Sequence, residues 1–109
     1  MSVESNRLLL LIDRELRDIN RQVIHKEFEK LAINDLKPSL DLVARARADY
    51  LKDLFDIAKE FPDSLPPSDR IETLKEHRIR YDELVVASKA LETAIERSYL
   101  DVSGGGDTY

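Results

Sequence analysis

The stretch from Ser68 to Val102 restricts the possible folds most, because it contains neither glycine nor proline. Pro66 and Pro67 precede it, and a run of three glycines begins soon after it, at Gly104. One set of residues recurs within it at alternating steps of three and four, which is typical of a helix packed along one side. These residues are Leu74, His77, Tyr81, Leu84, Ser88, Leu91, Ile95, Ser98 and Val102. The pattern predicts a single helix of roughly 50 Å that is capped by Ser68.

A first helix is predicted at the N-terminus, where Ser2 or Ser5 can act as the N-cap, and it extends to about Leu31. Its apolar residues also follow the three and four spacing. They are Leu9, Ile12, Leu16, Ile19 and Val23. After Val23 the apolar positions shift by one, so we expect the last turns of this helix to pack differently.

A second helix is predicted from about Pro38 to Phe61, because proline fits the first position of a helix. Its packing side is predicted to contain Leu40, Val43, Arg47, Tyr50, Leu54, Ile57 and Phe61, widened by Ala44, Leu51 and Ala58. Arg47 is the one charged member of this side. We expect a carboxylate to hold it, with Asp18, Asp82 and Glu83 as the available partners.

Short connections between three such helices force neighbours to run antiparallel. The sequence therefore predicts an all-α fold, an antiparallel up-down-up three-helix bundle with a long third helix and coiled-coil-like packing. Residues 1–102 would form this single domain. Residues 103–109 would form a flexible glycine-rich tail, with a docking peptide that ends in Tyr109 as the alternative.

The acidic composition argues against general nucleic-acid binding, since the net charge is −5 and such binding needs a basic surface. The absence of cysteine excludes disulfides and thiolate metal sites. The apolar run from Leu8 to Ile12 is too short for a signal-peptide core or a membrane span. We therefore expect a cytoplasmic protein with protein partners and no nucleic-acid or membrane partner.

No constellation of residues in the sequence indicates catalysis. The two histidines, His25 and His77, would lie roughly 18 Å apart in the predicted bundle, which is too far to share a metal ion. The acidic residues lie largely opposite the packing sides, and no glycine-rich loop precedes a helix to cradle phosphate. The prediction is a protein that is not an enzyme and has no catalytic, cofactor, metal or small-molecule substrate site.

The five consecutive apolar residues from Leu8 to Ile12 cover every side of the first helix, although a bundle helix needs only one apolar side. Leu8, Leu10 and Leu11 are therefore the predicted partner-binding residues. The alternative is that Leu65, in the connection between the second and third helices, covers them.

The predicted function is a non-enzymatic protein–protein interaction module, an adaptor or scaffold that forms a homodimer or binds a helical partner. Two alternatives remain open at this point. One is a small acidic chaperone that shields an amphipathic segment of a secreted or flagellar protein. The other is an acidic inhibitor of a nucleic-acid-binding protein, which would need its carboxylates gathered on one surface.

Overall fold

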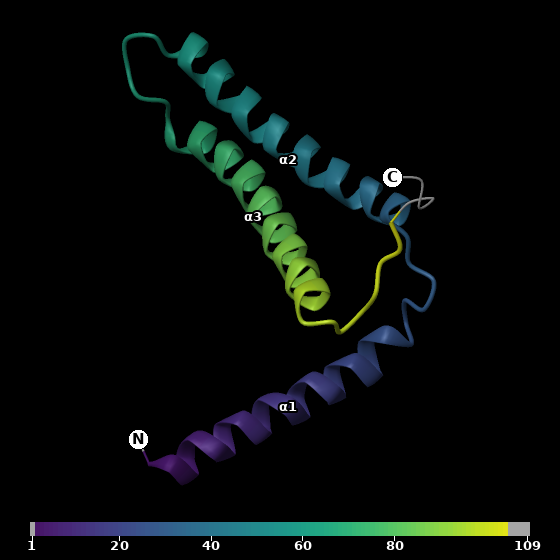
Figure 1. Cartoon of the computed structure of the whole chain (residues 1–109). Helices are drawn as coiled ribbons and strands as arrows, with labels where there is room; N and C mark the ends of the chain where they lie inside the picture. The colour runs from purple at the N-terminus through teal and green to yellow at the C-terminus, as the bar shows by residue number, and fades with distance from the viewer. Residues whose placement is uncertain (1, 105–109) are drawn as a thin grey trace. The chain divides into compact units, whose positions relative to one another are not determined.

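The computed structural model describes residues 2–104 and shows an all-α protein, as predicted from the sequence. Its helices are α1 (Val3–His25), α2 (Ile33–Glu60) and α3 (Ser68–Glu96) (Figure 1). The chain divides into two compact units. One is Leu36–Ala90, and the other joins the residues up to Asp35 with those from Leu91 onward. Of the predicted tail, residues 105–109 lie outside the described residues.

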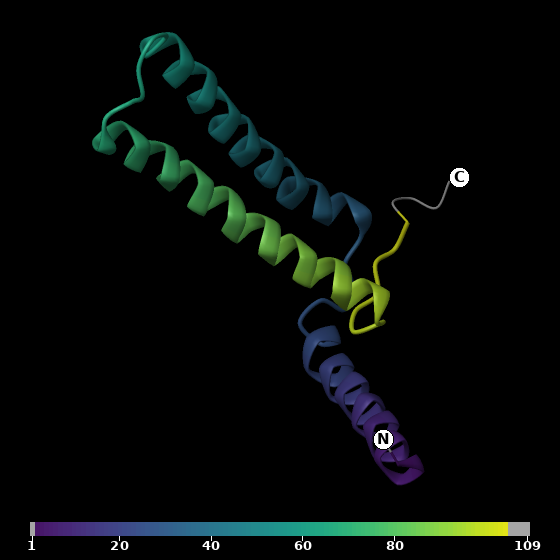
Figure 2. The same ribbon diagram turned by 90° about the vertical axis from the view of Figure 1, so that its left-hand side faces the viewer.

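The first unit is a helical hairpin in which α2 and α3 run antiparallel (Figure 2). The Tyr50 and Tyr81 rings meet across it, with centroids 6.1 Å apart. Arg47 Nε donates a hydrogen bond of 3.0 Å to the Tyr81 hydroxyl, and its guanidinium lies 5.3 Å from the centre of the Tyr81 ring. The prediction that a carboxylate holds Arg47 is therefore wrong, because the ring and hydroxyl of Tyr81 hold it instead.

The α3 side of the hairpin follows the predicted spacing, since Leu74, His77 and Tyr81 are all half-buried. The α2 side differs. Its buried residues are Asp53 and Ile57, and its half-buried residues are Ile33, Leu36, Val43, Ala46, Tyr50 and Asp56; Phe61, directly after the helix, is half-buried as well. Leu40 and Leu54 are about half exposed, so α2 is rotated about its axis relative to the predicted orientation.

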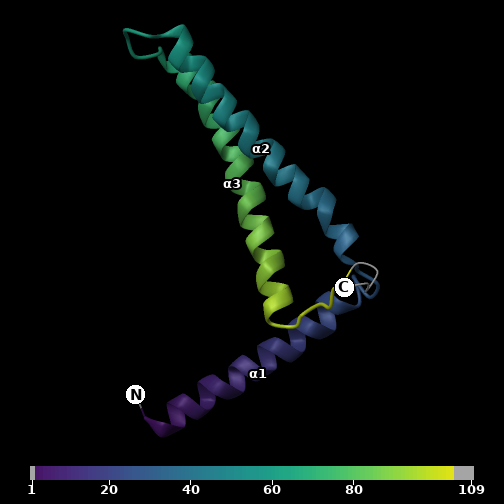
Figure 3. The same cartoon turned by 45° about the horizontal axis from the view of Figure 1, so that its top comes forward.

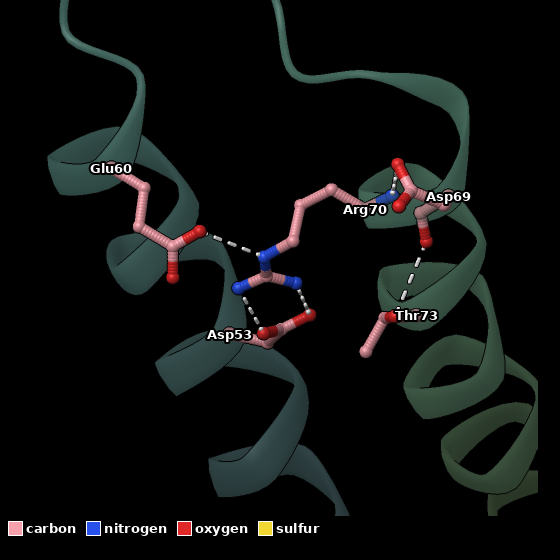
Figure 4. A network of polar contacts seen from close by, with 5 residues as sticks. All are labelled: Asp53, Glu60, Asp69, Arg70 and Thr73. Carbon is pink, nitrogen blue, oxygen red and sulfur yellow. Dashed lines mark hydrogen bonds and ion pairs between the residues drawn. The ribbon is translucent and has the colours of Figure 1, made fainter.

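A polar network explains this rotation of α2 (Figure 4). Arg70 donates two hydrogen bonds, of 2.7 and 3.1 Å, to the carboxylate of Asp53, and a third, of 3.0 Å, to Glu60. Asp53 is buried, and a buried carboxylate needs a paired, hydrogen-bonded partner. Its hydrogen bonds with Arg70 lower the pKa of Asp53 below its ordinary value, against the opposing effect of burial.

The start of α2 also differs from the prediction, because the helix begins at Ile33, five residues before Pro38. The carboxylate of Asp35 accepts a 2.7 Å hydrogen bond from the Ala32 N–H, as in the acidic half of a capping box. This cap starts the helix early. Pro38 then lies in its second turn, where one backbone hydrogen bond is absent.

The end of α3 comes at Glu96, earlier than the predicted Val102. Ser98 adopts a left-handed conformation with φ of 60°. The Tyr99 N–H donates to the Ala94 carbonyl at 2.8 Å and the Ser98 N–H to the Ile95 carbonyl at 3.1 Å, which is the Schellman pattern of helix termination. The sequence pattern continued past this point, but a left-handed residue cannot continue the helix.

The compact three-helix bundle predicted from the sequence is not formed. The α2–α3 pair is present, but none of the residues of α1 is buried. Among residues 2–104, the buried hydrophobic residues are Ile57, Ala94 and Leu100. The packing residues predicted for the first helix therefore lie on an exposed surface instead of in a core.

We expect Asp53→Asn to destabilise the hairpin by about 1.5–3 kcal/mol, the usual value for hydrogen bonds to charged groups. The amide keeps the size of the side chain but cannot accept both hydrogen bonds from Arg70 as a carboxylate does. Urea denaturation followed by helical circular dichroism measures the change. Asp56→Asn is the matched control, and a similar loss in both variants would contradict a specific role for Asp53.

The same pair predicts how stability depends on pH. The pKa of Asp53 is lowered on folding, so its contribution is complete above the unfolded-state pKa of about 4. It is lost as the pH falls from about 4 through the lower folded-state value. Urea midpoints of the wild type should therefore fall more steeply below pH 4 than those of Asp53→Asn, and parallel curves would contradict the assignment.

Candidate protein-interaction surface

The second unit is built on α1, whose start is set by a local cap. The Ser2 hydroxyl accepts a 3.1 Å hydrogen bond from the Ser5 N–H, which satisfies one of the free donors of the first turn. The helix ends at His25, shortly after the predicted shift in spacing at Val23, and short turns follow it. The predicted end at Leu31 is therefore too late.

The polar side of α1 contacts the segment that follows α3 (Figure 3). Arg21 donates to both carboxylate oxygens of Asp101, at 2.8 and 3.3 Å, and to the Ser98 carbonyl at 2.6 Å. Asp13 pairs with Arg97 at 3.4 Å. The hydrogen bonds with Arg21 lower the pKa of Asp101 below its ordinary value. These contacts fix which side of α1 faces its own chain.

Backbone pairing ties the same segment to the connection before α2. The Ile33 N–H donates to the Ser103 carbonyl and the Ser103 N–H to the Leu31 carbonyl, each at 3.0 Å. These bonds form an isolated parallel bridge between Ala32 and Ser103. Leu100, within the paired segment, is buried. The unit is thus held together by hydrogen bonds and ion pairs, with Leu100 buried between them in sequence.

The apolar side of α1 is exposed along its length. We call it the heptad stripe, and it contains Leu9, Ile12, Leu16, Ile19 and Val23. Their exposed fractions lie between 45% and 56%. At 100° per residue, the stripe lies more than a quarter turn away from Arg21 and its partners. The residues predicted to form a bundle core thus form an open surface.

The predicted partner-binding residues Leu8, Leu10 and Leu11 are exposed as well, by 57%, 72% and 47%. Leu8 borders the heptad stripe, whereas Leu10 and Leu11 point to other sides of the helix. Leu65, the residue that might have covered them, is 91% exposed and buries almost no surface of its own. The N-terminal half of α1 is therefore apolar on several sides.

The titratable residues are distributed without a metal-binding cluster among residues 2–104. His25 and His77 belong to different units. His25 lies in a polar hollow with Asp18 and Glu29, and its buried Nδ1 has no hydrogen-bond partner among the described residues. None of the described helices is both long and apolar enough to cross a membrane.

Sequence reasoning missed a groove on the hairpin between α2 and α3. It has a volume of about 490 Å³, and Leu42, Ala46 and Leu84 are among its lining residues. Leu42 and Ile79 did not fit the predicted packing spacing, and this misfit was the signal from which the groove could have been predicted.

Comparisons with protein-family models, curated proteins and solved structures find no match to this chain.

We expect Asp101→Asn to loosen the segment after α3 without unfolding the protein. Asp101 and Arg21 are exposed, and exposed pairs contribute little to global stability. Losing the paired carboxylate should, however, speed hydrogen exchange of the Ser103 and Ile33 amides, while exchange within the α2–α3 hairpin stays the same. Asp18→Asn, outside the ion pair, is the control. Unchanged exchange at Ser103 would contradict this role.

Proposed function

We propose that this protein is a non-enzymatic protein-interaction module of the cytoplasm that binds helices through α1. The observation that carries the proposal is the heptad stripe, whose five members are all about half exposed. Leu8 extends this apolar surface near the N-terminus, and the predicted partner-binding residues Leu10 and Leu11 are exposed on other sides of the same helix. A contiguous exposed apolar surface on a helix is typical of a contact with another protein.

The energetics favour association. Burying a whole aliphatic side chain contributes about 1.5–3 kcal/mol, so each half-exposed member of the stripe contributes about 1 kcal/mol when it becomes covered. The three buried hydrophobic residues of the described chain provide little folding free energy by comparison. A partner that covers the stripe would therefore stabilise α1 as well as bind it.

The spacing of the stripe favours a helical partner. Steps of three and four over Leu9 to Val23 match the side chains of another helix in coiled-coil packing. The inhibitor alternative fits less well, because Asp13, Asp53 and Asp101 are already paired with arginines. A chaperone would use the same stripe, with an amphipathic client as its helical partner.

We expect Leu16→Glu with Ile19→Glu to weaken self-association about 100-fold. Two buried apolar contacts are lost and two charges are introduced, and about 2.8 kcal/mol corresponds to that factor. Sedimentation velocity over a range of micromolar concentrations gives the dissociation constants. Arg7→Gln with Arg14→Gln, which changes the charge equally on the polar side, is the matched control.

The second variant is Leu10→Glu with Leu11→Glu, which tests the predicted partner-binding residues separately. If they take part, this variant should also weaken association, while α1 keeps its helical content by circular dichroism. Equal association of the wild type and the Leu16→Glu, Ile19→Glu variant would contradict a role for the stripe. A monomeric wild type at all concentrations would remove self-association from the proposal.

A further inference from the structure

The face of the hairpin that carries Arg47 has two adjacent open hollows. One, of about 270 Å³, is lined by Tyr50, Leu51, Leu54 and Leu74. The other, of about 220 Å³, is lined by Tyr50, Ile71, Leu74, Lys75 and Arg78. Because they share Tyr50 and Leu74, they form one continuous depression between α2 and α3, which we call the tyrosine groove.

The spacing of the lining residues identifies these hollows as helix-packing sites. Ile71, Leu74, Lys75 and Arg78 stand at positions i, i+3, i+4 and i+7 of α3. Four residues at this spacing form the hole that receives one side chain of a facing helix in knobs-into-holes packing. On α2, Tyr50, Leu51 and Leu54 line the groove at positions i, i+1 and i+4, which are three of the four positions of such a hole. The groove therefore has the form that accepts a third helix.

Resting on the proposed function, we propose that the heptad stripe of α1 in one copy packs into the tyrosine groove of a second copy. The same contact made reciprocally gives a dimer with two-fold symmetry. The stripe supplies side chains at steps of three and four, and the groove supplies holes at the matching spacing. Each copy has both the exposed heptad stripe and the open tyrosine groove, so a reciprocal dimer covers both.

The charges at the two edges are complementary. Glu15 lies beside the heptad stripe, one position before Leu16, and Glu4 lies on the same edge nearer the N-terminus. The edge of the groove carries Lys75 and Arg78. Within residues 2–104, Arg78 pairs with Asp82 one turn away, at 3.3 Å and in an exposed position, so it can exchange partners on binding.

Association of α1 with α1 is less favourable. In the heptad of the stripe, the positions that flank the apolar side carry Asp13 and Glu15 and no lysine or arginine. Two copies of α1 would bring these acidic residues together with no basic residue at the flanking positions of the facing helix, although Asp13 already pairs with Arg17 and Arg97 of its own chain. The groove on the other face of the hairpin, the larger as a single hollow, is also less suited, because it carries both signs of charge, with Arg45 and Arg80 beside Asp49 and Glu83.

The decisive experiment mixes two variants. The stripe variant is Leu16→Glu with Ile19→Glu, which has an intact groove. The groove variant is Leu51→Glu with Leu54→Glu, which has an intact stripe. Leu51 and Leu54 are 47% and 50% exposed, so their replacement should leave the hairpin folded. Sedimentation velocity should show the wild type as a dimer and each variant alone as a monomer at the same micromolar concentration.

An equimolar mixture of the two variants should regain dimers, because the intact stripe of one pairs with the intact groove of the other. One contact of the two is restored, so the mixed dimer should be weaker than the wild type. Dimers formed through α1 alone would not be regained, since the stripe variant cannot take part. Absence of dimers in the mixture would therefore overturn the proposal.

The control variant, Leu42→Glu with Ile79→Glu, changes the larger groove and should dimerise like the wild type. If the control variant were a monomer while the groove variant remained a dimer, the proposal would be overturned. A dimeric groove variant beside a monomeric stripe variant would also overturn it, but would leave the proposed function of α1 intact. A dimeric stripe variant would contradict both.

Charge reversal tests the contact without changing any apolar residue. Lys75→Glu with Arg78→Glu should weaken the dimer at least 10-fold, and adding Glu15→Lys should recover part of the loss. Lys75 and Arg78 are exposed, so these substitutions should change dimer formation without changing the stability of the fold. If Glu15→Lys restored none of the lost dimer affinity while the helical content stayed the same, the assigned contact between Glu15 and the Lys75 and Arg78 edge of the groove would be contradicted.

Discussion

The pairing of Asp53 with Arg70 sets the orientation of α2 in the hairpin. A carboxylate on the packing side of a helix cannot stay buried without its partner, so α2 must turn Asp53 toward α3. This rotation turns Asp53 and Ala46 toward α3 and leaves Leu51 and Leu54 about half exposed, whereas Ile57 is buried as predicted. The apolar side that is open to a third helix is therefore a consequence of one ion pair.

A related choice orients α1. Its arginines and aspartates offer many ion pairs, and the structure uses Arg21 and Asp13 to hold the segment that follows α3. Arg21 lies on the side of α1 opposite the heptad stripe and Asp13 lies at the edge of the stripe, so these contacts leave the stripe itself exposed. Polar contacts thus decide, in both units, which apolar residues remain available for a partner.

The sequence was sufficient to predict the three helices and the packing side of α3, because the three and four spacing from Leu74 to Ser88 reports helical packing directly. It could not predict the orientation of α2, since Asp53 reads as a solvated residue until Arg70 is placed beside it. Leu8, Leu10 and Leu11 are exposed, but so are Leu9 and Ile12, so exposure does not distinguish the predicted partner-binding residues from the predicted packing residues. Spacing identifies an apolar side but not the molecule that covers it.

The folding of α1 should be coupled to its association. Most helical stability in proteins comes from packing of the apolar side, and the apolar side of α1 is exposed. The ion pairs of Asp13 and Arg21 are exposed and add little. The helix therefore gains most of its stability when the heptad stripe is covered. Part of the binding free energy is then spent on ordering α1, which favours a contact that is reversible and sensitive to protein concentration.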